Sequence, residues 1–314
     1  MPTLPRRDFL KFTAAASLAA TLPFRSTAAA PAGANPFNRQ GKPLLRLSLA
    51  AYSFRENFPI MRGKPNDKVP AGRATDMFKF IDYCAAHGCE GAELTSYFFA
   101  EESDDYLLRL RRHAFLRGVA VSGTAIGNNF SHPKGSPKII EEIATTKKWI
   151  DRAALLGAPH IRVFAGVEPK GFARAEADKV VIASLEECCD YAGKKGIFLG
   201  LENHDSIGSA AALLPMVKAV KSPWIGINLD SGNFRTPDPY KDFAACVPYS
   251  VNVQFKVEID GDQPRTKKPA DLKRFTRLLR DGGYQGWVAL EYEAKEDSAV
   301  AVPHFLNEMR SLFA

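Results

Sequence analysis

The sequence predicts an α/β protein, a single (β/α)8 TIM barrel, and three observations support this prediction. From Leu45 onward, short apolar runs alternate with amphipathic runs about eight times. Eight such units in a chain of 314 residues fit one barrel better than a doubly wound sheet. No glycine-rich phosphate fingerprint follows the first apolar run, which disfavours a dinucleotide-binding fold.

The eight predicted strands are short apolar runs with β-branched and aromatic residues. In chain order they are "LRLSLAAYSF" (45–54), "GAELTSYF" (91–98), "VAVSGTAIG" (119–127), "PHIRVFAG" (159–166), "IFLGLENHD" (197–205), "WIGINLDSG" (224–232), "VNVQFKVEI" (251–259) and "GWVALEYEA" (286–294).

Amphipathic patterns between these runs predict helices, and several of them end in glycine, as a helix C-cap should. Clear examples are "ATDMFKFIDYCAAHG" (74–88), "DDYLLRLRRHAFLRG" (104–118), "IIEEIATTKKWIDRAALLG" (139–157), "SLEECCDYAGKKG" (184–196) and "ADLKRFTRLLRDGGY" (270–284). The long loop from Arg55 to Ala71 lies where barrel enzymes place lids.

The first thirty residues predict a twin-arginine signal peptide. Arg6 and Arg7 precede a modest apolar segment that is too short for an ordinary membrane span. Small residues follow, and we expect cleavage between Ala29 and Ala34. The expected partner is therefore the twin-arginine export machinery, and the expected destination is the periplasm. Because this route carries folded proteins, a cofactor or metal would be loaded before export.

The remaining chain divides into a Pro/Gly-containing linker over 31–44 and the barrel domain over 45–314. Nucleic-acid binding is not expected, because much of the formal net charge of +7 belongs to the signal segment. There, Arg6, Arg7, Lys11 and Arg25 against Asp8 contribute +3. The five cysteines include the adjacent Cys188 and Cys189, which have poor geometry for a mutual bridge, and we expect buried free thiols.

Polar side chains at the ends of the later strands locate the predicted active site, because barrel enzymes place it at the carboxyl ends of their strands. Alternation brings Glu202, Asp230, Gln254 and Glu291 to comparable depth on four neighbouring strands. Three carboxylates in one barrel mouth repel one another unless a cation separates them. This all-oxygen set suits Mn²⁺ or Mg²⁺, with Zn²⁺ or Co²⁺ less favoured. The alternative is a polar rim whose acids cap helices or pair with Lys and Arg.

Other strand-end residues are candidates for substrate contacts or proton transfer. His204 shares the inward face with Glu202 and could bind a substrate hydroxyl or carry a proton. Lys256 could stabilise an oxyanion or pair with Glu258. Glu93 and Arg162 could contact a polar sugar or form an ion pair inside the barrel.

Four motifs, "LENH", "NLDSGN", "VQFK" and "ALEYE", resemble the xylose isomerase-like TIM barrels in their order along the chain. That superfamily includes sugar isomerases and epimerases, endonuclease IV and 3-dehydroshikimate dehydratase, and the resemblance covers roughly residues 45 to 314. It implies that Glu202, Asp230, Gln254 and Glu291 hold a divalent metal ion. It also implies that Glu202 and Glu291 are the acid/base pair.

Three positions depart from the ketose 3-epimerase pattern. Gln254 replaces a His ligand, and the dehydroshikimate dehydratase branch has Gln there. Asn233 stands where epimerases have a His that helps to hold the substrate, and Gly208 stands where they have a Glu. The missing His ligands exclude the multinuclear zinc cluster of endonuclease IV.

The expected function is that of a metal-dependent sugar isomerase or epimerase. It would act on an unphosphorylated carbohydrate in the periplasm by carboxylate-mediated proton transfer through an enediolate. One alternative is a metal-dependent lyase or dehydratase on a keto-sugar or keto-acid, which Gln254 favours. Another is a non-catalytic carbohydrate-binding barrel, against which the paired carboxylates argue. The resemblance also leaves open a homo-oligomer.

Overall fold

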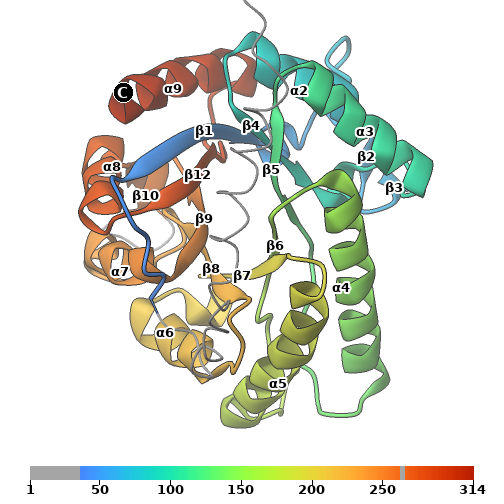
Figure 1. Cartoon of the computed structure of the whole chain (residues 1–314), viewed down its shortest axis with the longest axis vertical. Coiled ribbons are helices and arrows are strands. Elements are labelled where there is room, and N and C mark those ends of the chain that lie inside the picture. Colours follow the sequence, from blue (N-terminus) through green and yellow to red (C-terminus); the bar gives the residue numbers. More distant parts are fainter. Residues whose placement is uncertain (1–35, 262–265) are drawn as a thin grey trace, which may run out of the picture. The chain divides into compact units, whose positions relative to one another are not determined.

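Eight parallel strands close into a barrel in the computed structural model, which describes residues 36–261 and 266–314 (Figure 1). The predicted (β/α)8 TIM barrel is therefore confirmed. The strand order around the barrel is β1-β12-β9-β8-β7-β6-β5-β4. The strands are β1 (Leu44–Ala50), β4 (Gly91–Thr95), β5 (Ala120–Ala125), β6 (His160–Val163), β7 (Phe198–Glu202), β8 (Ile225–Asp230), β9 (Ser250–Phe255) and β12 (Gln285–Leu290).

Helices between the strands form the outer layer of the barrel (Figure 1). They are α2 (Met77–Ala86), α3 (Asp104–Leu116), α4 (Pro137–Leu156), α5 (Arg174–Gly193), α6 (Ala210–Ala219), α7 (Pro239–Cys246), α8 (Leu272–Asp281) and α9 (Ser298–Phe313). Side-chain caps start several of them, as where Ser136 accepts a hydrogen bond from the backbone N–H of Ile139. After α8, the C-cap residue Gly282 has φ −80°, and the next residue, Gly283, takes the left-handed conformation at φ +68°.

The predicted strands run past the observed ones because several apolar runs continue into tight turns. Ala51–Phe54 and Ser96–Phe98 are short 3₁₀ helices that follow β1 and β4. The loop over 55–71 contains a small hairpin of β2 (Ile60–Met61) and β3 (Lys64–Pro65). A second hairpin, β10 (Glu258–Asp260) with β11 (Lys267–Pro269), follows β9.

The predicted signal peptide over residues 1–30 lies outside the described residues, as does the start of the predicted linker over 31–44. The described part of that linker is anchored to the barrel. The N–H of Phe37 donates to the carbonyl of Pro248 at 2.8 Å, and its ring meets Phe198 edge-on at 5.7 Å. Arg39 donates to the carbonyl of Ser250. Because Phe198 and Ser250 open their strands, this segment covers the end of the barrel opposite the strand carboxyl ends.

Close packing at the amino-terminal end of the barrel explains one glycine. A Cβ on Gly123 would lie 2.0 Å from Cε1 of His160, so only glycine leaves room for that buried ring. All five cysteines are free and buried, as expected. Within the described ranges, no helix combines the length and apolar character needed to cross a bilayer.

Candidate active site at the carboxyl ends of the strands

Five carboxylates lie in the upper part of the barrel, four of them at the carboxyl ends of the strands and Glu93 within β4, and we call them the acidic cluster. Parallel register places an amide beside two of them, since Glu202 lies opposite Asn228, and Asp230 opposite Gln254. Four of the five are at most 5% exposed, which is a strongly desolvated position for carboxylates. The members are Glu93 on β4, Glu202 on β7, Asp230 on β8, and Glu291 and Glu293 after β12.

Glu202 is held by a cation and an amide. Arg162 Nε lies 3.0 Å from Glu202 Oε2, and Asn233 Nδ2 donates to Glu202 Oε1 at 2.9 Å. Arg162 also donates through Nη1 to the carbonyl of Ile126 at 2.8 Å, and its guanidinium lies 4.0 Å from the ring centroid of Phe164. Arg162 thus forms the ion pair inside the barrel that the sequence left open, and Asn233 contacts the same acid.

Lys256 lies among three other carboxylates. Its Nζ is 3.2 Å from Asp230 Oδ2 and 3.2 Å from Glu291 Oε2, and it also contacts Glu293. The backbone N–H of Gly232 donates to the other oxygen of Asp230 at 2.7 Å. In the described part of the chain Lys256 therefore pairs with these acids, and not with Glu258 as one interpretation of the sequence proposed.

A layer of amides supports the cluster from below. Asn252 Nδ2 and Gln254 Nε2 donate to the two oxygens of Glu93 at 2.7 and 2.6 Å. Asn228 Nδ2 donates to Gln254 Oε1 at 2.7 Å, and Asn252 Nδ2 also lies 2.8 Å from Asn228 Oδ1. Asn228 and Asn252 were not among the predicted site residues, although each precedes a predicted one by two positions on the same strand face.

Burial raises the pKa of four members of the acidic cluster, whereas in Glu293 the effect of burial is outweighed by Lys256 and the pKa is lowered. It raises the pKa of Glu93 and of Glu291 to about 7 and the pKa of Asp230 to about 6. The pKa of Glu202 is also raised by burial, against the opposing effect of Arg162. Burial alone would lower the pKa of Lys256, but its acidic partners hold that pKa well above the usual range. Carboxyl groups with a pKa near 7 are suited to both taking up and releasing protons at neutral pH.

His204 lies at the rim of the site. Its side chain is 37% exposed, its Nδ1 lies 2.9 Å from Asp205 Oδ2, and its ring is 4.7 Å from that of Phe164. Glu202 is the nearest member of the acidic cluster along the chain, two residues before it. His204 therefore lies beyond the end of β7 with its side chain partly open to solvent.

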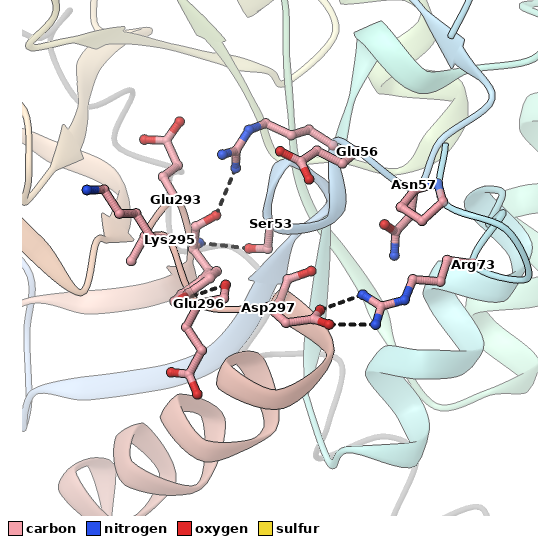
Figure 2. A pocket seen from close by; sticks show the side chains of 13 residues that line it. Ser53, Glu56, Asn57, Arg73, Glu293, Lys295, Glu296 and Asp297 are labelled. Atoms are coloured by element: carbon pink, nitrogen blue, oxygen red, sulfur yellow. Dashed lines mark hydrogen bonds and ion pairs between the residues drawn. The ribbon is translucent and has the colours of Figure 1, made fainter. Parts of the chain in front are cut away.

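A cavity of about 360 Å³ adjoins the acidic cluster between the loops after β1 and β12. Figure 2 shows its lining, with Arg73 directed at Asp297 and Glu293 at the opposite side. Arg73 Nη1 donates to Asp297 Oδ1 at 2.6 Å, and the Tyr292 N–H donates to Ser53 Oγ at 2.9 Å. Because Glu293 lines the cavity and also contacts Lys256, the cavity reaches the acidic cluster.

The donor set fits a hard divalent cation. Asp230 Oδ2 and Glu291 Oε2 already converge on one cationic atom, Lys256 Nζ, and Asp230 Oδ2 is buried without a hydrogen-bond donor. The acidic cluster has five carboxylates, against which the described residues place Arg162 and Lys256 as buried cations. This excess of negative charge favours a further cation.

The side chains nevertheless do not stand as a finished ligand shell. Across 36–261 and 266–314, no three His, Cys, Asp or Glu side chains are grouped as ligands around one point. Instead, Lys256 lies among three of the carboxylates, and Arg162 pairs with Glu202. Gln254 Oε1 accepts one hydrogen bond, from Asn228, so the amide oxygen retains a lone pair for a metal ion.

Comparison with known proteins identifies the family. The model of the xylose isomerase-like TIM barrel family matches residues 81–309. The chain belongs to this family. Residues 3–23 match the signal sequence of the twin-arginine translocation pathway, which supports export by that route to a destination outside the cytoplasm.

Individual relatives of this xylose isomerase-like barrel are distant. A Mus musculus protein named as a candidate hydroxypyruvate isomerase is 25% identical over 262 residues, which cover 77% of this chain and 88% of that protein. A xylose isomerase-like TIM barrel protein of Mycobacterium smegmatis, solved in complex with magnesium, superposes with a TM-score of 0.65 at 20% identity over 87% of this chain and 98% of its own. The 3-keto-D-glucoside 4-epimerase of E. coli superposes with a TM-score of 0.63 at 16% identity over 85% and 99%. At these identities the two structures support the fold alone.

Proposed function

We propose that this protein is a metal-dependent isomerase or epimerase that acts on an unphosphorylated carbohydrate in the periplasm. The family and its isomerase and epimerase neighbours support the class of enzyme. The twin-arginine signal supports the compartment, where sugar phosphates are not the common metabolites.

One observation carries the proposal: two buried carboxyl groups, Glu202 and Glu291, come from opposite parts of the barrel mouth and have raised pKa values. Glu202 ends β7 and Glu291 follows β12, with β8 and β9 between them in the barrel. A substrate lying over Asp230 and Lys256 would have one carboxyl group on each side. Such a pair can remove a proton from one carbon and return it to the same or the neighbouring carbon.

The protein's own groups would divide the reaction as follows. One carboxylate takes the proton from the carbon next to the substrate carbonyl, and the bonding electron pair moves into an enediolate. The opposite carboxylic acid then delivers a proton, so the product has the same formula as the substrate. Lys256 would stabilise the developing negative charge on oxygen, and Asn233 and His204 would contact substrate hydroxyls. Arg162 would keep Glu202 oriented.

A divalent ion, Mn²⁺ or Mg²⁺ in preference to Zn²⁺ or Co²⁺, would be held by Glu202, Asp230, Gln254 and Glu291 and would polarise the substrate oxygens. The cavity beside Glu293 would hold the part of the carbohydrate that does not react. Its lining combines Arg55, Arg73 and Lys295 with acidic and amide side chains, a mixture that suits hydroxyl groups better than an apolar ligand.

The decisive experiment is elemental analysis of the protein purified without added metal, beside Glu202→Ala and Asp230→Ala. We expect about one divalent ion per chain, lost in both variants. An empty wild-type site that also refuses added Mn²⁺ would remove the metal from the proposal. A second experiment tests the acid/base pair. Glu291→Gln should keep its fold, measured by circular dichroism, and should lose turnover of ketoses and aldoses.

The second candidate is a lyase or dehydratase on a keto-sugar or keto-acid, and Gln254 favours it. The same carboxylate pair could remove a proton and expel a β-hydroxyl group as water. Product mass separates the two candidates, because an isomerase conserves the mass of its substrate and a dehydratase lowers it by one water. A non-catalytic carbohydrate-binding barrel would instead retain ligand affinity in Glu291→Gln and show no turnover in the wild type.

A further inference from the structure

The ammonium group of Lys256 is shared between two kinds of carboxylate. Asp230 and Glu291, each 3.2 Å from Nζ, are proposed metal ligands with side chains at most 6% exposed. Glu293, the third partner, is 33% exposed and is not a proposed ligand. Lys256 therefore spans the buried centre of the site and its solvent-facing edge.

We propose that Lys256 is a built-in counter-cation: it neutralises Asp230 and Glu291 when no metal is bound, and it withdraws to Glu293 when a divalent ion enters. This inference rests on the metal site of the proposed function. It adds that metal affinity is set by competition with a side chain of the same protein.

The need for a counter-cation follows from the geometry of the two acids. Asp230 ends β8, whereas Glu291 follows β12, yet one oxygen of each lies 3.2 Å from the same nitrogen. Two buried carboxylates that both contact one nitrogen atom repel each other strongly when no cation lies between them. Lys256 supplies that charge, so the empty site stays ordered. A metal ion must then displace two ion pairs, which weakens its binding.

The local backbone allows the side chain to move while its main chain stays fixed. The Lys256 N–H donates to Ser231 Oγ at 2.9 Å, which ties the residue to the end of β8. The lysine stem passes over Gly232, where a Cβ would lie 2.8 Å from both Cβ and Cδ of Lys256. Glycine at this position is therefore needed for the stem to lie where it does, while Nζ, at the end of the flexible four-carbon stem, already contacts both the buried acids and Glu293.

Calorimetric titration of the chelator-treated protein with Mn²⁺ tests the inference. Lys256→Met should bind Mn²⁺ about tenfold or more tightly than the wild type, because no ion pair has to be displaced. Glu293→Gln should bind it more weakly, because Lys256 loses its alternative partner. The exposed Lys179→Met is the matched control and should leave the affinity unchanged. If Lys256→Met does not fold, Lys256→Gln replaces it.

The double variant separates displacement from simple loss of charge. If Glu293 acts through Lys256, the effect of Glu293→Gln should disappear in the Lys256→Met background. The inference is overturned, with the metal site intact, if the wild type binds Mn²⁺ and Lys256→Met binds it no more tightly, or if Glu293→Gln weakens binding equally in both backgrounds. If neither protein binds Mn²⁺, the metal site itself is wrong. Binding by Lys256→Met alone would support the counter-cation and overturn metal dependence of the wild type.

Discussion

Arg162 Nε lies 3.0 Å from Glu202 Oε2, and both side chains are 5% exposed, so this ion pair links β6 and β7 inside the barrel. The pair fixes the carboxyl group that we propose for proton transfer, and Asn233 holds its other oxygen. Desolvation makes such a pair costly to form, but removing one partner costs more because the other charge stays buried.

Replacing the cation of this pair should destabilise the fold. Arg162→Met is expected to lower the free energy of unfolding by roughly 3 kcal/mol, because Glu202 would remain buried without its cation. Urea denaturation followed by circular dichroism measures the change. In Arg162→Met/Glu202→Leu the unpaired charge is absent, and part of the loss should be recovered. Equal losses in the single and double variants would show that packing of the arginine, and not its charge, matters.

Replacing the hydrogen-bond acceptor Glu93 by glutamine, which carries a donor group, tests the amide layer. Glu93 accepts hydrogen bonds from Asn252 and Gln254, so the NH₂ group of a Glu93→Gln variant would face at least one donor. We expect a loss of about 1–3 kcal/mol in the free energy of unfolding. The exposed neighbour Glu90 provides the control, since Glu90→Gln should stay within about 0.5 kcal/mol of the wild type. Similar losses in the two variants would argue against the amide layer as drawn.

Thiol reactivity should follow burial. The five cysteines are free and at most 4% exposed, and burial raises the pKa of Cys188 to about 12. Because the thiolate is the reactive form, the folded protein should react slowly with a disulfide reagent such as Ellman's reagent. Complete reaction of all five thiols is expected only in denaturant. Fewer than five reactive thiols in denaturant would instead reveal a disulfide in the exported protein.

The sequence was sufficient to predict the barrel, because about eight apolar runs alternate with amphipathic runs along the chain. The parallel register places Asp230 opposite Gln254, whereas Glu202 lies opposite Asn228, two residues before Asp230. Helix ends were similarly accessible from terminal glycines such as Gly157, which takes the left-handed conformation at φ +78°.

The pairing of charges could not be predicted, because it depends on how side chains cross the barrel. Arg162 reaches Glu202 on the next strand, whereas Lys256 reaches both Asp230 and Glu291 on the strands that flank its own. Strand alternation also places Lys256 on the same face as Glu258. However, β9 ends at Phe255, and Glu258 belongs to the separate β10–β11 hairpin, so the alternation does not continue to Glu258. Local pattern thus predicts candidate acids near the strand ends and leaves their partners undetermined.

Acid should weaken the fold partly through His160. Burial lowers the pKa of this histidine to about 4, from an ordinary value of about 6.5. The unfolded chain therefore binds a proton between pH 6.5 and 4 that the folded protein does not. The stabilisation is complete above pH 6.5 and is lost as the pH falls toward 4, with a total change on the order of 3 kcal/mol.

Urea denaturation of the wild type and of His160→Gln at pH 7 and pH 4.5 should show a smaller loss of the free energy of unfolding in the variant. His304→Gln, at an exposed position, is the control and should follow the wild type. Parallel losses in wild type and His160→Gln would mean that other groups, such as protonating carboxylates, govern acid unfolding.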